Sequence, residues 1–144
     1  MNKEFVPPLE ALALKELGFD EPCLFAYYGK SDISNFRESD YVLCGDRHNS
    51  SLQRDGRIST PLFQQAFRWF REKYDLQYNI TWNKFYDKTP YQYEVRPTWR
   101  NEPLRPYGIA GMCSTYEEAE IQCLERLISI VNEKQAAKKA KESI

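Results

Sequence analysis

Cys113 and His48 are the residues of this chain whose types come closest to catalytic chemistry. Cys113 stands just before an expected helix, and the partial positive charge at a helix N-terminus can lower the pKa of a thiol. Such a thiol could act as a nucleophile or a redox group, but no histidine stands at a recognisable spacing from it. The simpler interpretation is that Cys113 is a small apolar residue at the end of a strand. His48 lies in a polar stretch, where solvation explains it without a role as base or metal ligand.

The cysteines give no zinc-binding pattern. They stand at positions 23, 44, 113 and 123, and no pair has the C-x-x-C spacing of structural zinc sites. A tetrahedral site would need all four thiolates, or three of them with His48, from distant segments of the chain. The sequence therefore predicts no metal and no cofactor.

The short motifs of common enzyme classes are missing from the sequence. It has no glycine-rich phosphate loop, no G-x-S-x-G and no H-E-x-x-H. Acidic residues cluster at Asp20 and Glu21 and again at Glu117 and Glu118, but the capping of a helix explains the second group. These observations predict a protein that is not an enzyme.

An aromatic hairpin between Gln77 and Trp99 is the candidate interaction surface. Exposed tyrosine and tryptophan rings on a sheet can stack on bases, with lysine and arginine placed against phosphates. The alternative is that the rings pack against helices. We favour it because aromatic residues are the main source of apolar side chains in this chain. If both faces carry rings, one face could still bind a partner, including a second copy of the chain. The candidate residues are Tyr78, Trp82, Tyr86, Tyr91, Tyr93, Arg96, Trp99 and Arg100.

These residues need a scaffold, and the first part of the chain predicts one helix and two paired strands. Two prolines introduce a helix over about 9–17, which Gly18 ends. A strand is expected over 23–28, and the short apolar run 41–44 could pair with it. The polar stretch 45–56 is expected to be a mobile loop.

The second half of the chain predicts two more helices and a small sheet. Thr60 as N-cap, followed by a proline, predicts a helix over 60–74, in which aromatic residues recur at three- and four-residue steps. Alternating side chains predict the two strands of the hairpin, and 107–112 could be a third strand. A capping box that begins at Ser114 or Thr115 predicts the last helix.

Length and composition favour one soluble domain. The chain has 144 residues, 42% of them hydrophobic, and its formal charge of −1 gives no overall attraction to phosphate. We expect an α+β fold, with a small, mostly antiparallel sheet packed against two or three helices in a single domain over 1–132. The charged segment 133–144 is expected to be a frayed helical extension or disordered. No signal peptide and no membrane span is recognised, which favours a cytoplasmic protein with reduced thiols.

Three blocks resemble short uncharacterised proteins encoded in phages and prophages of Bacteroidetes-type bacteria. The blocks are LEALALKELGFDEPC (9–23), LFQQAFRWFREKYDL (62–76) and STYEEAEIQCLERLISIV (114–131), and together they cover a third of the chain. The resemblance implies a mobile-element protein that acts inside a bacterial cell. It implies no activity for any particular residue.

A weaker similarity concerns DNA-binding domains of the AP2 and integrase N-terminal types. Their layout of three short strands before a helix that opens T-x-E-E-A is similar to the segment that leads into Thr115–Ala119, but the strands here lack a dense set of arginines. We therefore expect a non-enzymatic protein-binding module, a phage- or prophage-type accessory protein with an unidentified protein partner or a second copy of itself. The alternative is a nucleic-acid-binding module that uses the hairpin 77–95. No membrane partner is expected.

Overall fold

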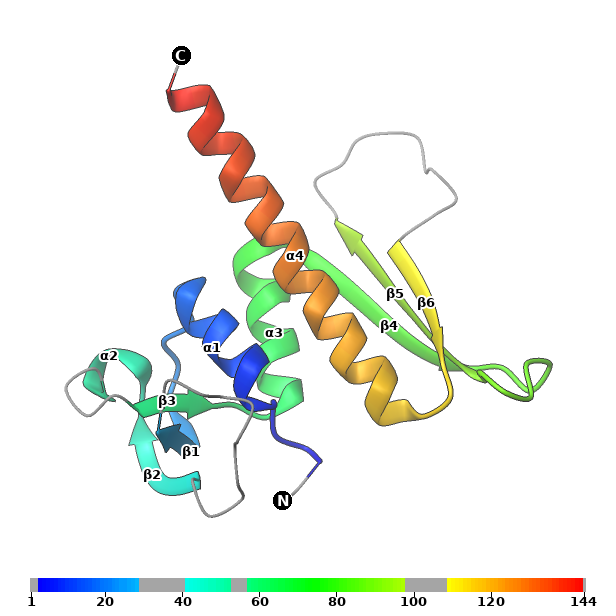
Figure 1. Cartoon of the computed structure of the whole chain (residues 1–144), viewed down its shortest axis with the longest axis horizontal. Helices are drawn as coiled ribbons and strands as arrows, with labels where there is room; N and C mark the ends of the chain where they lie inside the picture. Colours follow the sequence, from blue (N-terminus) through cyan, green and yellow to red (C-terminus); the bar gives the residue numbers. More distant parts are fainter. Residues whose placement is uncertain (1–2, 29–40, 53–56, 98–108, 144) are drawn as a thin grey trace. The chain divides into compact units, whose positions relative to one another are not determined.

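The computed structural model describes residues 3–28, 41–52, 57–97 and 109–143. Its helices and antiparallel strands confirm the predicted α+β class (Figure 1). The sequence predicts one small sheet, whereas the strands form two three-stranded sheets, one in each of two compact units, Met1–Ala66 and Phe67–Ile144. The single domain over 1–132 stays a prediction.

Helix α1 (Pro8–Glu16) lies within one residue of the predicted bounds. Pro8 occupies the first turn, where its missing N–H group costs no helical hydrogen bond. The helix ends because Gly18 adopts a φ of 95°, a left-handed conformation that glycine accepts without strain. The Gly18 amide donates to the Lys15 carbonyl over 3.0 Å, which satisfies one of the free carbonyls at the helix end.

The first sheet has the strand order β2-β1-β3 and consists of β1 (Cys23–Tyr28), β2 (Tyr41–Arg47) and β3 (Arg57–Thr60). β1 is the central strand and runs antiparallel to both neighbours, so that Ala26 lies opposite Val42 on one side and Ser59 on the other. The predicted pairing of 41–44 with 23–28 is therefore confirmed.

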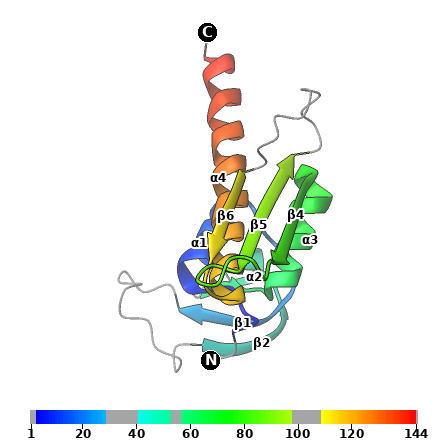
Figure 2. The same cartoon turned by 90° about the vertical axis from the view of Figure 1, so that its right-hand side faces the viewer.

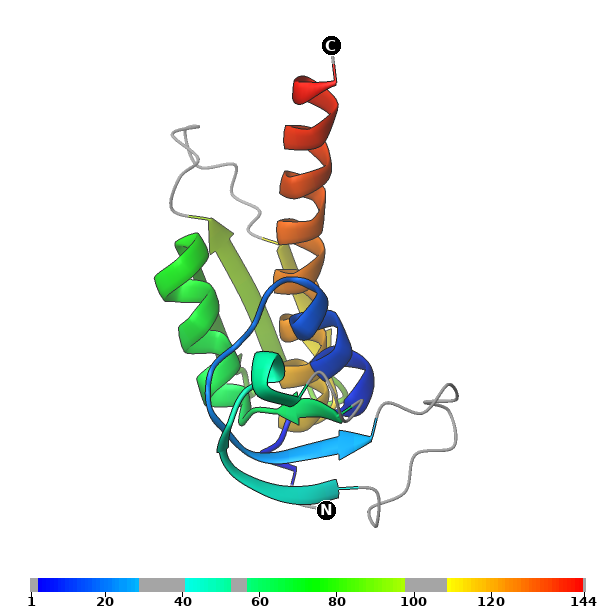
Figure 3. The same cartoon turned by 90° about the vertical axis from the view of Figure 1, so that its left-hand side faces the viewer.

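In the described part of the stretch 45–56, which is 45–52, most residues belong to a strand or a helix and not to the loop that the sequence predicts. β2 continues to Arg47, and a short helix, α2 (Asn49–Leu52), follows it. α2 lies next to β3 (Figure 3). Residues 53–56 lie outside the described part of the chain.

Polar side chains hold α2 in place, and this explains why so polar a stretch is ordered. The buried Asn49 donates from Nδ2 to the Phe19 carbonyl at 2.8 Å and accepts at Oδ1 from the Ser59 amide at 2.9 Å. Asp20 Oδ1 accepts from the Ser50 amide at 2.7 Å, and this bond keeps the pKa of the Asp20 carboxyl below its usual value. Bonds to partners far away in the sequence cannot be recognised from local composition.

Helix α3 (Phe63–Tyr74) begins later than the sequence predicts, although its end is correct. Thr60 is not an N-cap, because it is the last residue of β3 and lies opposite Phe25 in the sheet. The amide of Phe63, in the first turn of α3, donates to the Glu4 carbonyl at 2.9 Å, so the N-terminal segment satisfies an amide that the helix leaves free. Strand pairing therefore takes precedence over the local helix-start signal.

The second sheet has the order β4-β5-β6 and consists of β4 (Leu76–Trp82), β5 (Tyr91–Pro97) and β6 (Ile109–Cys113). All neighbours are antiparallel, which confirms the predicted hairpin and the predicted third strand (Figure 2). Trp82 lies opposite Tyr91 next to the turn, and Tyr93 in the middle of the sheet lies opposite Gly111.

Helix α4 (Tyr116–Glu142) packs across one face of the second sheet (Figure 2). Thr115 is the N-cap, as the sequence predicts: its Oγ1 accepts from the Glu118 amide at 3.2 Å. The second bond of the predicted capping box goes to the preceding residue, because Glu118 Oε2 accepts from the Ser114 amide at 3.3 Å and from the Ser114 hydroxyl at 2.9 Å. From 132 to 142 the helix continues with exposed side chains, so this part of the charged tail is helical. The buried apolar residues of α4 are Ala119, Cys123, Leu124, Leu127, Ile128, Ile130 and Val131.

Candidate interaction surface at the β4–β5 hairpin

The turn between β4 and β5 is a hydrogen-bonded loop that extends beyond the sheet (Figure 1). At its base, the Asn83 amide donates to the Pro90 carbonyl at 2.7 Å, and the Asn83 carbonyl accepts from the Tyr86 amide at 3.3 Å. Asn83 Oδ1 also accepts from the Phe85 amide at 3.0 Å, a bond that asparagine commonly makes in turns. One asparagine therefore fixes much of the backbone that carries the tip of the hairpin.

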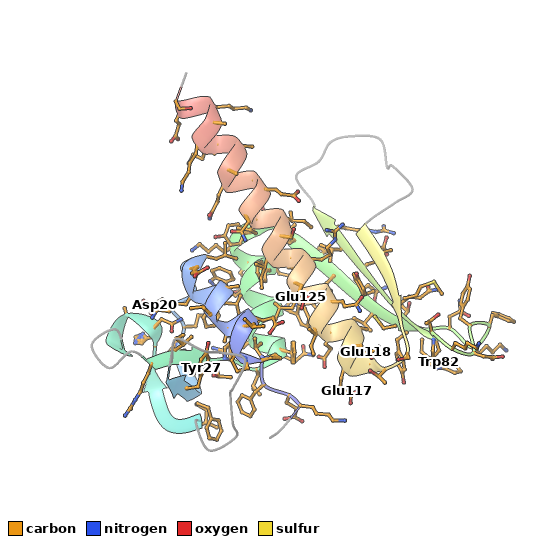
Figure 4. All side chains as sticks on the ribbon, in the orientation of Figure 1. Asp20, Tyr27, Trp82, Glu117, Glu118 and Glu125 are labelled. Carbon is orange, nitrogen blue, oxygen red and sulfur yellow. The ribbon has the colours of Figure 1, made fainter. Side chains whose placement is uncertain are left out.

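Three large rings are exposed at this turn. Trp82 is 63% exposed, Phe85 81% and Tyr86 46%, and we call these residues the tip cluster. Lys84 lies beside them, with its Nζ 5.4 Å from the centroid of the Phe85 ring. Figure 4 shows Trp82 at the turn end of the hairpin. Large apolar groups gathered on a surface commonly mark a binding site.

Phe85, the most exposed of the three, is not among the residues that the sequence selects. It lies in the turn and outside the alternation of either strand, so the periodic pattern does not include it. The available signal is its context, since a phenylalanine between turn-forming polar residues such as Asn83 and Asp87 has no strand position from which to enter a core.

Two other candidate rings lie on the face of the hairpin that the helices cover. Tyr78 stacks on Phe67 of α3, with ring centroids 4.1 Å apart. Tyr91 meets Tyr116 of α4 edge to face at a centroid distance of 6.0 Å. For these two rings, the contacts agree with the interpretation that the hairpin's rings pack against helices.

Tyr93 is buried on the same face and depends on a glycine. Gly111 lies opposite it in β6, and a Cβ atom at that position would overlap the Tyr93 ring. Glycine is required here because the ring packs directly on the backbone. Burial raises the pKa of the Tyr93 hydroxyl, and the neighbouring Cys113 adds to the same effect. The hydroxyl therefore stays protonated near neutral pH.

The outer face of the second sheet is polar along β4 and β5, whereas β6 adds Ala110 and the exposed Met112 to it. Alternation places Asn79 and Thr81 of β4 beside Gln92 and Glu94 of β5 on this face, where they line a shallow hollow. Arg96 continues the row and forms an ion pair with Glu94, with Nε and Oε1 2.7 Å apart. Within the described residues, the outer face therefore offers no platform of exposed rings for stacking bases. Trp99 and Arg100 lie outside the described part of the chain.

Cys113 closes β6 as a buried residue, in line with the simpler interpretation. Burial raises the pKa of its thiol, and the charge of Glu118 raises it further. The lowering of the pKa that a helix N-terminus can cause is therefore outweighed at Cys113. His48 is half-buried between β2 and α2, and its charge helps to lower the pKa of the Asp20 carboxyl. No group of three metal-ligating side chains occurs in the described ranges.

The Cys123 thiol is expected to be almost inert in the folded protein. Burial, followed by the charge of Glu120, raises its pKa to about 12, so that very little thiolate exists at neutral pH. At about pH 8, a disulfide reagent should label Cys123 at least about a hundredfold more slowly in the native chain than in urea. Mass spectrometry of the labelled peptides measures this ratio. Equal labelling rates in the two conditions would contradict the buried position of Cys123.

No protein-family model, curated protein or solved structure matches this chain. None of the helices in the described residues combines the length and the apolar character needed to cross a membrane. The tip cluster and its ordered turn are therefore the features from which a function can be inferred.

Proposed function

We propose that this chain is a non-enzymatic protein-binding module that inserts its tip cluster into an apolar pocket of a partner protein. The observation that carries the proposal is the joint exposure of Trp82, Phe85 and Tyr86 on a hydrogen-bonded turn. Tryptophan and tyrosine are enriched among the residues that dominate binding energies. A turn that is already ordered also loses less conformational entropy when it binds.

The rings are the main source of affinity in this proposal. Burial of an aromatic side chain removes roughly 150–250 Å² from water, and apolar area contributes about 25 cal/mol per Å². An exposed ion pair of a tip lysine would contribute only about 0–1 kcal/mol. Even partial burial of the three rings should therefore decide whether the partner binds.

The resemblance to phage and prophage proteins suggests in which cell the protein acts and from which organism its partner comes. We expect an accessory factor in the cytoplasm of a bacterial cell, where it engages a protein of the host or of the phage. The alternative partner, a second copy of the chain, would make the tip cluster part of a symmetric contact.

Affinity capture from a bacterial lysate tests the proposal by comparing the wild type with a variant that lacks the rings of the tip cluster. The bait proteins are the wild type, the tip variant W82A/F85A/Y86A and the control variant L9A/L24A, which removes exposed apolar side chains outside the hairpin. We expect at least one protein to be retained by the wild type and the control and to be lost from the tip variant. Circular dichroism checks that all three baits are folded.

Two further results decide whether the tip cluster binds a protein and whether that protein is a second copy of the chain. If wild type and tip variant capture the same proteins equally well, the tip cluster does not bind a protein and the proposal fails. Analytical ultracentrifugation of the wild type and the tip variant tests self-association. A dimer that only the wild type forms would identify the partner as a second copy.

Nucleic acid is the second candidate partner, because Lys84 and Lys88 stand beside the exposed rings. Lysines could contact phosphates while the rings stack on bases. Fluorescence anisotropy with labelled single-stranded and duplex oligonucleotides tests this candidate. Binding at low salt that weakens steeply with added salt, and that the tip variant loses, would favour nucleic acid over protein. We expect no binding.

A further inference from the structure

Two lysines flank the most exposed part of the tip cluster. Lys84 precedes Phe85, Lys88 follows Tyr86 by two positions, and both lysines are exposed. Within the part of the chain that the structure describes, neither ammonium group forms an ion pair with a carboxylate. Asp87 is the one acidic residue between them, so the tip carries a net positive charge next to its rings.

In the structure, one of these charges lies next to a ring of the tip cluster. Lys84 Nζ stands over the Phe85 ring at 5.4 Å from its centroid, a cation–π arrangement. A partner group that packs against the free edge of Phe85 comes within reach of this ammonium. The apolar and the charged contact are therefore neighbours, and a partner can satisfy both with adjacent side chains.

We propose that the partner presents an acidic segment of a protein, in which apolar side chains are flanked by carboxylates. This inference rests on the proposed function and names the chemistry of its partner. The apolar side chains pack against Trp82, Phe85 and Tyr86, and the carboxylates pair with Lys84 and Lys88. Complementary charge at the rim of a contact favours the correct partner and speeds its approach.

The arrangement favours a protein segment over a nucleic acid. Phosphate polymers are bound through many repeated charges, and each lysine that contacts a phosphate adds one released counterion. The tip offers two lysines and one aspartate, whereas it exposes three large rings. The tip therefore has a large apolar surface and few charges. Such a site fits a protein segment in which carboxylates lie beside apolar side chains better than it fits a phosphate backbone.

A random dodecapeptide library displayed on phage tests the inference, with the full-length chain as the immobilised target. Selection against the wild type, with subtraction on W82A/F85A/Y86A, should enrich peptides in which Asp or Glu adjoins Leu, Ile, Phe or Trp. The affinity of a synthetic peptide from the selection is then measured for two charge variants. These are K84E/K88E at the tip and K138E/K141E on the exposed end of α4, which makes the same change of charge elsewhere.

The peptide should bind K84E/K88E at least about tenfold more weakly than the wild type, because two attractive contacts become repulsive. Its affinity for K138E/K141E should stay within about twofold. Enriched peptides without acidic residues, equal binding by both charge variants, or no peptide that depends on the tip would each overturn the inference. A lysate protein captured through the tip rings would still support the proposed function, so the two proposals fail separately.

Discussion

Phe67→Ala is expected to lower the free energy of unfolding by about 3–5 kcal/mol. The Phe67 side chain is 0% exposed, and its ring stacks on Tyr78 at a centroid distance of 4.1 Å. The substitution removes this contact between α3 and β4 and leaves a cavity that the surrounding side chains fill only partly. Urea denaturation followed by far-ultraviolet circular dichroism measures the loss as a lower transition midpoint.

Phe85→Ala is the matched control, since it truncates the same side chain at a position that is 81% exposed. Its free energy of unfolding should stay within about 0.5 kcal/mol of the wild-type value. The pair of variants thus separates the two roles of phenylalanine in this chain: one fills the core and the other is available to a partner. Similar losses for both variants would contradict the exposed position of the tip cluster.

The second sheet and the last helix could be predicted from the sequence because their signals are local. Tyr78, Ile80 and Trp82 alternate with polar residues, and this period of two identifies a strand with one covered face. The N-cap Thr115 and the carboxylate of Glu118 mark the start of α4 through bonds between residues that are close in sequence. Such local signals predict the folded structure correctly when no distant segment of the chain competes for the same backbone groups.

The first sheet could be predicted only in part, because distant residues determine it. Strand β3 pairs with β1 across a long sequence separation, and this pairing gives Thr60 a strand conformation despite its helix-start signal. Likewise, the order of α2 depends on the bonds that Asn49 makes to Phe19 and Ser59. Local composition alone describes this stretch as a loop.

The candidate interaction surface could also be predicted only in part from the sequence. The sequence identifies the hairpin's rings, but it cannot assign each ring to a covered or an exposed position. Tyr93 is buried because Gly111 leaves room for its ring, which is a relation between two strands. Phe85 is exposed because the turn holds it outside both strands. The interpretation of the rings as core therefore applies to the body of the hairpin and not to its tip.

Asn49→Ala is expected to lower the free energy of unfolding of the first unit by about 2–4 kcal/mol. The side chain is buried, and it bonds to two backbone groups at 2.8 and 2.9 Å, the Phe19 carbonyl and the Ser59 amide. Alanine removes both bonds and leaves the two groups away from water without these partners, which costs more than the loss of an exposed bond. Amide hydrogen exchange at Ser59 reports the change directly and should accelerate at least about tenfold in the variant.

Asn79→Ala provides the control, because Asn79 is an asparagine exposed on the outer face of the second sheet. Its stability should change by less than about 0.5 kcal/mol, and exchange at Ser59 should be unaffected. If Asn49→Ala accelerated exchange everywhere to the same extent, its effect would be global unfolding and not the release of α2 from β3. Faster exchange confined to Ser59 and the segments beside it would show that one buried amide orders a stretch whose composition predicts a loop.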